Sequence, residues 1–166
     1  MANVQSVTLG DNITELTLIT DIIPGRAQAL KDFLNVIIKN PGTTIGRINT
    51  IHYARWVLID NDTRLLFCSN FDGTLMDYLK DFALQIPQGL DGIWGNCVGY
   101  VSSTNFPGFV KWVQQYQVPV ACYYAAYPAA TVPEVVQALD WKSKTDDYQQ
   151  KLSQAPKQPE AGIGPQ

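Results

Sequence analysis

His52 is the only histidine of the chain, and its side chain is the one best suited to chemistry near neutral pH. A neutral imidazole can ligate haem iron or act as a general base, because the usual pKa of histidine is about 6.5. The alternative is a buried neutral imidazole that is hydrogen-bonded to the backbone or to a neighbouring side chain. His52 is therefore a candidate catalytic residue and the candidate metal ligand.

Arg55 and Asp72 are the other two candidate catalytic residues. The guanidinium of Arg55 can hold an anionic ligand, a haem propionate or a peroxide oxygen if it faces a cavity. Its alternative role is an ion pair with Asp72, Asp60 or Glu15, since an uncompensated buried charge costs about 3–5 kcal/mol. Asp72 stands where an expected strand gives way to a helix. It is either an acid with a catalytic role or a residue that caps the helix or closes an Asx-turn.

Aromatic side chains are frequent on the expected strands, where they can line a pocket for a flat apolar ligand. Trp56, Phe67 and Tyr124, together with His52, are the candidate cofactor-binding residues. The alternative is that these aromatic residues form core or interface only. His52 and Arg55 are expected on opposite faces of one strand, unless a bulge intervenes.

Composition excludes several classes of protein. The chain has 166 residues, 16% of them charged, and a formal net charge of −3, with only 12 lysines and arginines, so a basic nucleic-acid-binding surface is excluded. No secretory signal and no apolar run of about 18 residues is visible, which predicts a cytoplasmic protein without a membrane span. Cys68, Cys97 and Cys122 have no CxxC spacing and lie in apolar stretches, so we expect free core thiols and no zinc site.

Apolar periodicity gives the order of the elements. Strands are expected at residues 13–21, 48–59, 64–71 and 118–127, and helices at 24–38, 75–86, after Pro107 and from residue 132. Thr74 with Asp77, and Thr131 with Glu134, have the spacing of helix-capping pairs. The order predicts an α+β, ferredoxin-like βαββαβ fold with an antiparallel four-stranded sheet and extra helices. Residues 1–154 are expected as one domain, and the Pro- and Gly-rich residues 155–166 as a disordered tail.

Both sides of the expected sheet are largely apolar or aromatic, yet its helices cover only one side. An antiparallel sheet with a face in water carries polar residues on that face. We therefore expect a second copy of the chain to cover the other face, in a homodimer or a higher homo-oligomer.

The order of elements over residues 13–127 resembles the dimeric α+β barrel superfamily, which includes antibiotic-biosynthesis-type monooxygenases, chlorite dismutases and dye-decolourising peroxidases. The strings at residues 50–56 (TIHYARW) and 69–73 (SNFDG) look similar to a peroxidase-like branch. Ser69 stands in place of the first glycine of the peroxidases' GxxDG motif, and no histidine follows His52, so their proximal ligand has no counterpart here.

The resemblance implies a homodimer that binds haem or another small apolar or aromatic ligand for peroxidase-like oxidative chemistry. His52 would be the ligand or base, Arg55 would assist it, and Asp72 would be a distal acid by analogy with the peroxidases. One alternative is a cofactor-independent monooxygenase that acts on an aromatic substrate. The other is a non-catalytic ligand-binding or assembly module.

Overall fold

The computed structural model describes residues 8–9 and 12–154. The chain divides into two compact units, Met1–Pro133 and Glu134–Gln166. The elements of the first unit are β1 (Thr8–Leu9), β2 (Ile13–Asp21), α1 (Ala27–Lys39), the 3-10 turns η1 (Pro41–Thr43) and η2 (Ile45–Arg47), β3 (Ile51–Ile59), β4 (Arg64–Asp72), α2 (Leu75–Gln85), α3 (Pro87–Trp94) and α4 (Phe106–Tyr116). No helix within residues 8–9 and 12–154 is long and apolar enough to cross a membrane.

The sheet has the strand order β1-β2-β4-β3, and all neighbouring strands are antiparallel. β1 is only two residues long, so β2, β4 and β3 form most of the sheet. The predicted hairpin of β3 and β4 is confirmed. Its turn runs through Asp60, Asn61 and Asp62, whose φ angles of 52°, 55° and 66° lie in the left-handed region that Asp and Asn tolerate.

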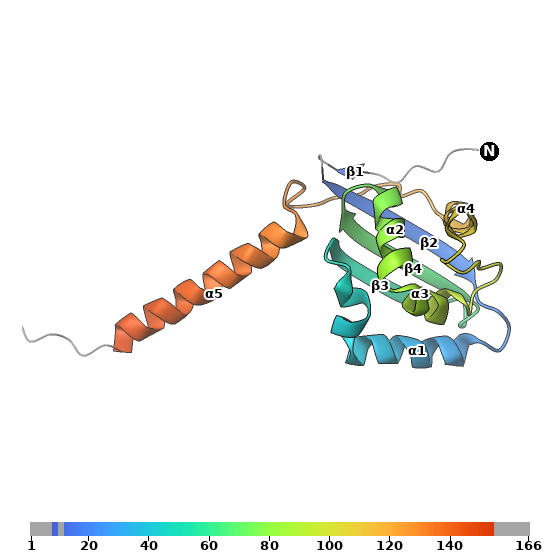
Figure 1. Cartoon of the computed structure of the whole chain (residues 1–166), viewed down its shortest axis with the longest axis horizontal. Coiled ribbons are helices and arrows are strands. Elements are labelled where there is room, and N and C mark those ends of the chain that lie inside the picture. The colour runs from blue at the N-terminus through green and yellow to red at the C-terminus, as the bar shows by residue number, and fades with distance from the viewer. Residues whose placement is uncertain (1–7, 10–11, 155–166) are drawn as a thin grey trace, which may run out of the picture. The chain divides into compact units, whose positions relative to one another are not determined.

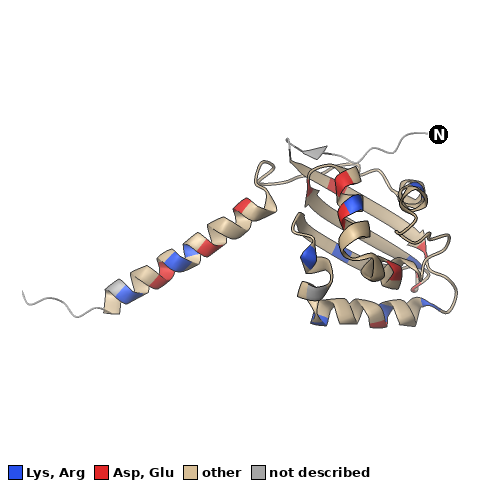
Figure 2. Cartoon of the chain, in the orientation of Figure 1, with Lys and Arg blue, Asp and Glu red and all other residues tan. Residues whose placement is uncertain are grey.

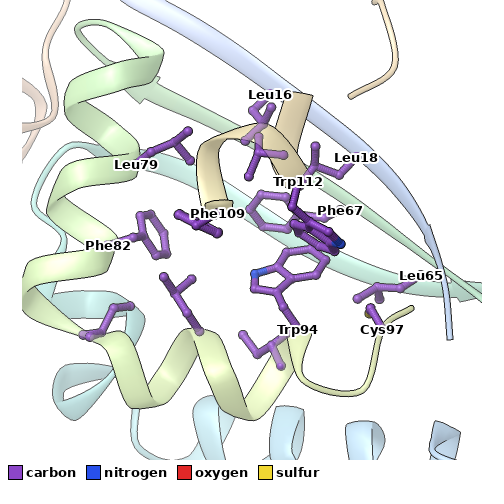
Figure 3. Packing of buried hydrophobic residues seen from close by; sticks show 14 of the residues in the cluster. Leu16, Leu18, Leu65, Phe67, Leu79, Phe82, Trp94, Cys97, Phe109 and Trp112 are labelled. Atoms are coloured by element: carbon purple, nitrogen blue, oxygen red, sulfur yellow. The ribbon is translucent and has the colours of Figure 1, made fainter. Parts of the chain in front are cut away.

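Helices α1 to α4 lie over one face of this sheet (Figure 1) and share one hydrophobic core with it. Figure 3 shows Trp94 of α3 and Trp112 of α4 beside Phe67 of β4, with Leu79 and Phe82 of α2 in the same cluster. The Trp94 ring meets Phe67 and Trp112 edge-on, with ring centroids 5.4 and 5.5 Å apart. Aromatic rings of this kind bury large apolar areas, so they supply much of the packing between sheet and helices.

The predicted fourth strand is wrong. Residues 118–127 form no strand, and only Gln117 and Val118 meet the edge of β2, through a bridge from Gln117 to Leu18 and a Val118 N–H bond of 2.9 Å to the carbonyl of Thr17. Pro119 follows at once and has no N–H to donate, so a ladder cannot continue there. The observed fold is thus α+β with an antiparallel sheet of three long strands.

The predicted capping of α2 is confirmed, because the Thr74 hydroxyl accepts from the backbone N–H of Asp77 at 3.2 Å. The expected role of Cys122 as a core residue is wrong: its side chain is exposed, whereas Cys97 is buried and Cys68 half-buried. All three thiols are free. Cys122 lies outside the core because its segment is not a strand of the sheet.

Helix α5 (Val132–Gln154) is a single 23-residue helix that runs into the second unit. Acidic and basic residues are interspersed along it, whereas charged residues are sparse on the three long strands (Figure 2). Lys142 pairs with Asp146, and Lys144 with Asp140 at 2.7 Å, both at the i,i+4 spacing that stabilises isolated helices. The expected disordered tail, residues 155–166, lies outside the described residues.

Candidate functional site

The face of the sheet opposite the helices, called here the outer face, carries four rows of side chains across β2, β4 and β3. The strand register gives the rows as Glu15–Asn70–Tyr53, Thr17–Cys68–Arg55, Ile19–Leu66–Val57 and Asp21–Arg64–Ile59, and Asp72 lies beyond the first row at the end of β4. The end with the first row and Asp72 is called here the polar end, and the apolar row of Leu66 lies between the row of Arg55 and the charged row of Arg64.

A β-bulge places His52 at the polar end of this face. The register of β3 against β4 shifts between Ile51 and Tyr53, so His52 is the extra residue. Regular alternation would have sent His52 to the helix-covered face, but the bulge lets its ring reach Asp72 on the outer face. His52 and Arg55 were expected on opposite faces unless a bulge intervened. The bulge is present, and both side chains lie on the outer face.

Asp72 connects two parts of the chain. Its Oδ1 lies 2.7 Å from His52 Nε2, and its Oδ2 accepts the backbone N–H of Val132 at 2.8 Å. The His52 and Asp72 side chains are only 12% and 13% exposed, so the pair is shielded from water. When His52 donates to this carboxylate through Nε2–H, Nδ1 is the ring nitrogen that is left to accept a hydrogen bond.

Asp72 does not cap the helix that follows it, which was the structural alternative to a catalytic role. Helix α2, which follows directly, is capped by Thr74. Asp72 instead binds the N–H of Val132 at the start of α5, far away in the sequence. A negative charge at that position also interacts favourably with the positive end of the α5 dipole.

Arg55 does not form the ion pair expected as its alternative role. Its Nη2 lies 3.8 Å from Cys68 Sγ, and among the described residues no carboxylate pairs with it. Asp72 is bound to His52, and Asp60 is bound to Arg64. The guanidinium is exposed on the second row of the outer face, where it can meet an anion or an aromatic ring.

The polar end also includes Glu15, Asn70 and Tyr123, which sequence reasoning did not assign to one site. Glu15 is 3% exposed and accepts from the Thr17 hydroxyl at 3.1 Å. The Tyr123 hydroxyl is hydrogen-bonded to Asn70, while burial and the nearby Glu15 charge raise the pKa of Tyr123. Residues 117–131 thus cover part of the polar end. The sequence alone could not group these residues, because the pairing of Glu15 with Asn70 depends on the register of β2 against β4.

The candidate cofactor-binding residues do not share one pocket. Trp56 and Phe67 lie on the helix-covered face, with ring centroids 5.2 Å apart, whereas His52 contacts Asp72 on the outer face. Tyr124 is 83% exposed in the segment after α4. The sheet itself therefore separates His52 from the aromatic pair.

A haem does not fit the helix-covered side. The cavity beneath the sheet, lined by Leu18, Trp56, Phe67, Trp94 and Trp112 among others, has a volume of about 30 Å³. That is room for roughly two water molecules, whereas sites for drug-sized ligands have volumes of about 300–1,000 Å³. The aromatic residues on the helix-covered side therefore do not enclose a haem within one chain.

Within the described part of the chain, no group of three or more His, Cys, Asp and Glu side chains is placed to hold a metal ion. Comparison with protein-family models, with curated proteins and with solved structures finds no match to this chain.

Proposed function

We propose that the chain is a subunit of a homo-oligomeric ligand-binding assembly, in which a second copy covers the outer face and a small apolar or aromatic ligand with an anionic group binds against that face. The observation that carries the proposal is the incompletely buried apolar row Ile19–Leu66–Val57, in which Val57 is 40% exposed, beside Arg55, whose guanidinium has no carboxylate partner among the described residues. An open row of this kind at the centre of a sheet is typical of an interaction surface.

The strand order supports a ferredoxin-like arrangement of the dimeric α+β barrel type. β2, α1 and β3 form a split βαβ unit, with β4 inserted between the two parallel strands. Gln117 and Val118 stand beside β2, where the fourth strand of that fold would lie. In such an assembly the outer faces of two sheets pack together and bury the apolar rows of both copies.

The oligomer is tested by sedimentation equilibrium at micromolar concentration. We expect the wild type to be a dimer or larger, and Leu66→Glu on the central strand to dissociate it, because a carboxylate would be buried at the interface. Leu84→Glu is the matched control, since Leu84 is 81% exposed on α2. A monomeric wild type, or a folded Leu66→Glu variant that stays associated, would contradict the proposal.

The ligand is tested with 8-anilinonaphthalene-1-sulfonate, which combines flat apolar rings with an anionic group. We expect saturable binding to the wild type and about tenfold weaker binding to Arg55→Gln, because a charge-assisted hydrogen bond is lost. Arg47→Gln, at an exposed position on η2, is the control. Equal affinity for both variants and the wild type would remove Arg55 from the site.

A second candidate function is cofactor-independent oxygenation of an aromatic substrate, favoured by the His52–Asp72 pair. Nδ1 of His52 would take a proton from an acidic phenol or enol, and the substrate anion would reduce dioxygen. One oxygen atom would enter the substrate as a carbonyl oxygen and the other would leave as water, with the four electrons and two hydrogens supplied by the substrate, which becomes a quinone or a diketone. Oxygen uptake with phenolic substrates that persists in the presence of EDTA and is lost in His52→Ala would establish it.

The three free thiols fit a reducing compartment such as the cytoplasm, and localisation of a tagged full-length chain tests this part of the proposal.

A further inference from the structure

Strand β3 is an edge strand with an open hydrogen-bonding side. It pairs with β4, and no other described strand pairs with it. The Ile22 N–H bonds to the Thr63 carbonyl at 2.8 Å, so the backbone of residue 63 points toward β2. In an antiparallel sheet, successive residues of a central strand bond alternately to its two neighbours. The odd-numbered residues of β4 therefore bond to β2, and residues 66, 68 and 70 bond to β3. Their partners on β3 are residues 53, 55 and 57. The other residues of this stretch, Ala54, Trp56 and Leu58, therefore direct their N–H and C=O groups to the open side.

This edge lacks the features with which proteins usually prevent strand pairing. Exposed edges are protected by lysine, proline, bulges or short length. Residues 53–59 contain no lysine, proline or glycine, and Arg55 is their only charge. The bulge lies at the beginning of β3, so the remainder of this nine-residue strand is regular.

Apolar area is exposed on both sides of β3. On the outer face, Tyr53 and Val57 are 77% and 40% exposed. On the helix side, Trp56 is only half-buried, whereas the Phe67 ring beside it on β4 is 4% exposed. An edge strand that exposes apolar area on both faces gains burial on both when another strand pairs with it.

We propose that β3 pairs antiparallel with β3 of a second copy about a two-fold axis at Trp56, which joins two sheets edge to edge. This interface is separate from the covering of the outer face, and each can exist without the other. Four copies joined through both interfaces would form a closed tetramer.

The register follows from charge and from the bulge. An axis at Arg55 would place two guanidinium groups directly opposite each other, which is destabilising. An axis at Ala54 would bring the irregular backbone at His52 into the ladder. An axis at Trp56 uses all of residues 53–59 and avoids both problems.

The side chains complement one another in this register. Ala54 lies opposite Leu58 of the second copy, a small residue beside a large one. Arg55 lies opposite Val57 of the second copy, so its aliphatic stem packs on an apolar side chain while the guanidinium reaches water. Because the same sequence satisfies both sides of the axis, a second copy is the partner that fits this edge.

Disulfide trapping tests the register in a Cys68→Ser, Cys122→Ser background, which removes the thiols near Arg55 and on the surface. Variants Arg55→Cys and Val57→Cys are purified separately, mixed and oxidised. Opposite residues in a non-hydrogen-bonded pair have Cα atoms about 4.5 Å apart, within the range of a disulfide. We expect a cross-linked dimer in the mixture, and little in either variant alone, where like positions are offset diagonally by about 7–8 Å.

Absence of the cross-link in the mixture, or equal cross-linking of the separate variants, would overturn the proposal. Faces of packed sheets lie about 10 Å apart, too far for this disulfide, so the outer-face interface cannot produce the same result. The Leu66→Glu variant tests that other interface independently, since Leu66 lies on the central strand.

Charge variants at Val57 give a second measurement. Val57→Glu places a carboxylate opposite Arg55 of the second copy and should strengthen edge association about tenfold, whereas Val57→Lys should weaken it by a similar factor. Weakening by both substitutions would indicate that Val57 is buried by face packing alone. No change with either would show that β3 stays unpaired.

Discussion

The carboxylate of Asp72 accepts the backbone N–H of Val132 at 2.8 Å, across 60 positions of the sequence. The last residue of the central strand thus binds the first residue of α5. The same carboxylate holds His52 through its other oxygen, so the bulge in β3 and the beginning of α5 share one acceptor.

Replacing Asp72 should therefore cost more stability than replacing an exposed acid. Asp72→Ala leaves the His52 and Val132 donors unpaired, and we expect the free energy of unfolding to fall by about 2–4 kcal/mol. Asp32→Ala is the control, since Asp32 is exposed on α1 and bonds to the exposed Gln28 one turn away. Urea denaturation measures both, and equal effects would show that the shared acceptor adds nothing to stability.

Two glycines of α3 should respond in opposite directions to alanine. A Cβ at Gly92 would lie 2.1 Å from Cζ of Phe33, whereas one at Gly89 meets only Ile86 at an ordinary 3.6 Å. Gly89→Ala should stabilise the protein by up to about 1 kcal/mol through helix propensity, and Gly92→Ala should destabilise it by about 1–3 kcal/mol. Thermal unfolding of the two variants checks the sign. A stable Gly92→Ala variant would mean that α1 moves freely away from α3.

Tyr78 and Ser69 form a buried hydroxyl pair, 2.6 Å between oxygens, beneath the stacked Phe71 ring. Tyr78→Phe leaves the Ser69 hydroxyl without its partner and should cost about 1–3 kcal/mol. The double variant with Ser69→Ala should cost less than the sum of the single changes, because no buried polar group remains unpaired. An additive cycle from urea denaturation would contradict the coupling.

Alkaline pH should unfold the protein because Tyr78 loses its hydroxyl proton. Burial raises the pKa of Tyr78 above its usual 10.0, so the folded state keeps its proton when the unfolded state has lost it. Tyr100 behaves alike, because burial and its bond to Asp91 raise its pKa too. Stability is therefore unaffected below about pH 10 and falls as pH rises above it. Absorbance at 295 nm should show these tyrosines ionising together with loss of circular dichroism; ionisation in the folded protein would disprove the burial argument.

Hemin should not bind through His52. Because the sheet separates His52 from Trp56 and Phe67, and the cavity beneath the sheet is about 30 Å³, we expect a hemin titration to show the same Soret band in wild type and His52→Ala. A Soret shift that disappears in His52→Ala would show that a second copy completes a haem site on the outer face.

The sequence by itself determined the elements whose evidence is local. The alternation of residues 13–21, the turn at Asn61 and the capping pair Thr74–Asp77 each predicted the observed structure, because alternation, turn chemistry and caps depend on neighbouring residues. The β-branched and aromatic run at 118–127 predicted a strand that does not form, since a strand needs a partner along its whole length and Pro119 interrupts the ladder beside β2.

Only the tertiary structure decided which candidate residues meet. His52, Arg55 and Asp72 were found from residue type, but a bulge of one residue placed His52 on the face of Asp72, and the strand register brought Glu15 beside Asn70. A shift of one position in a strand exchanges its faces, so the composition of a site on a sheet depends on contacts between distant segments and not on spacing along one strand.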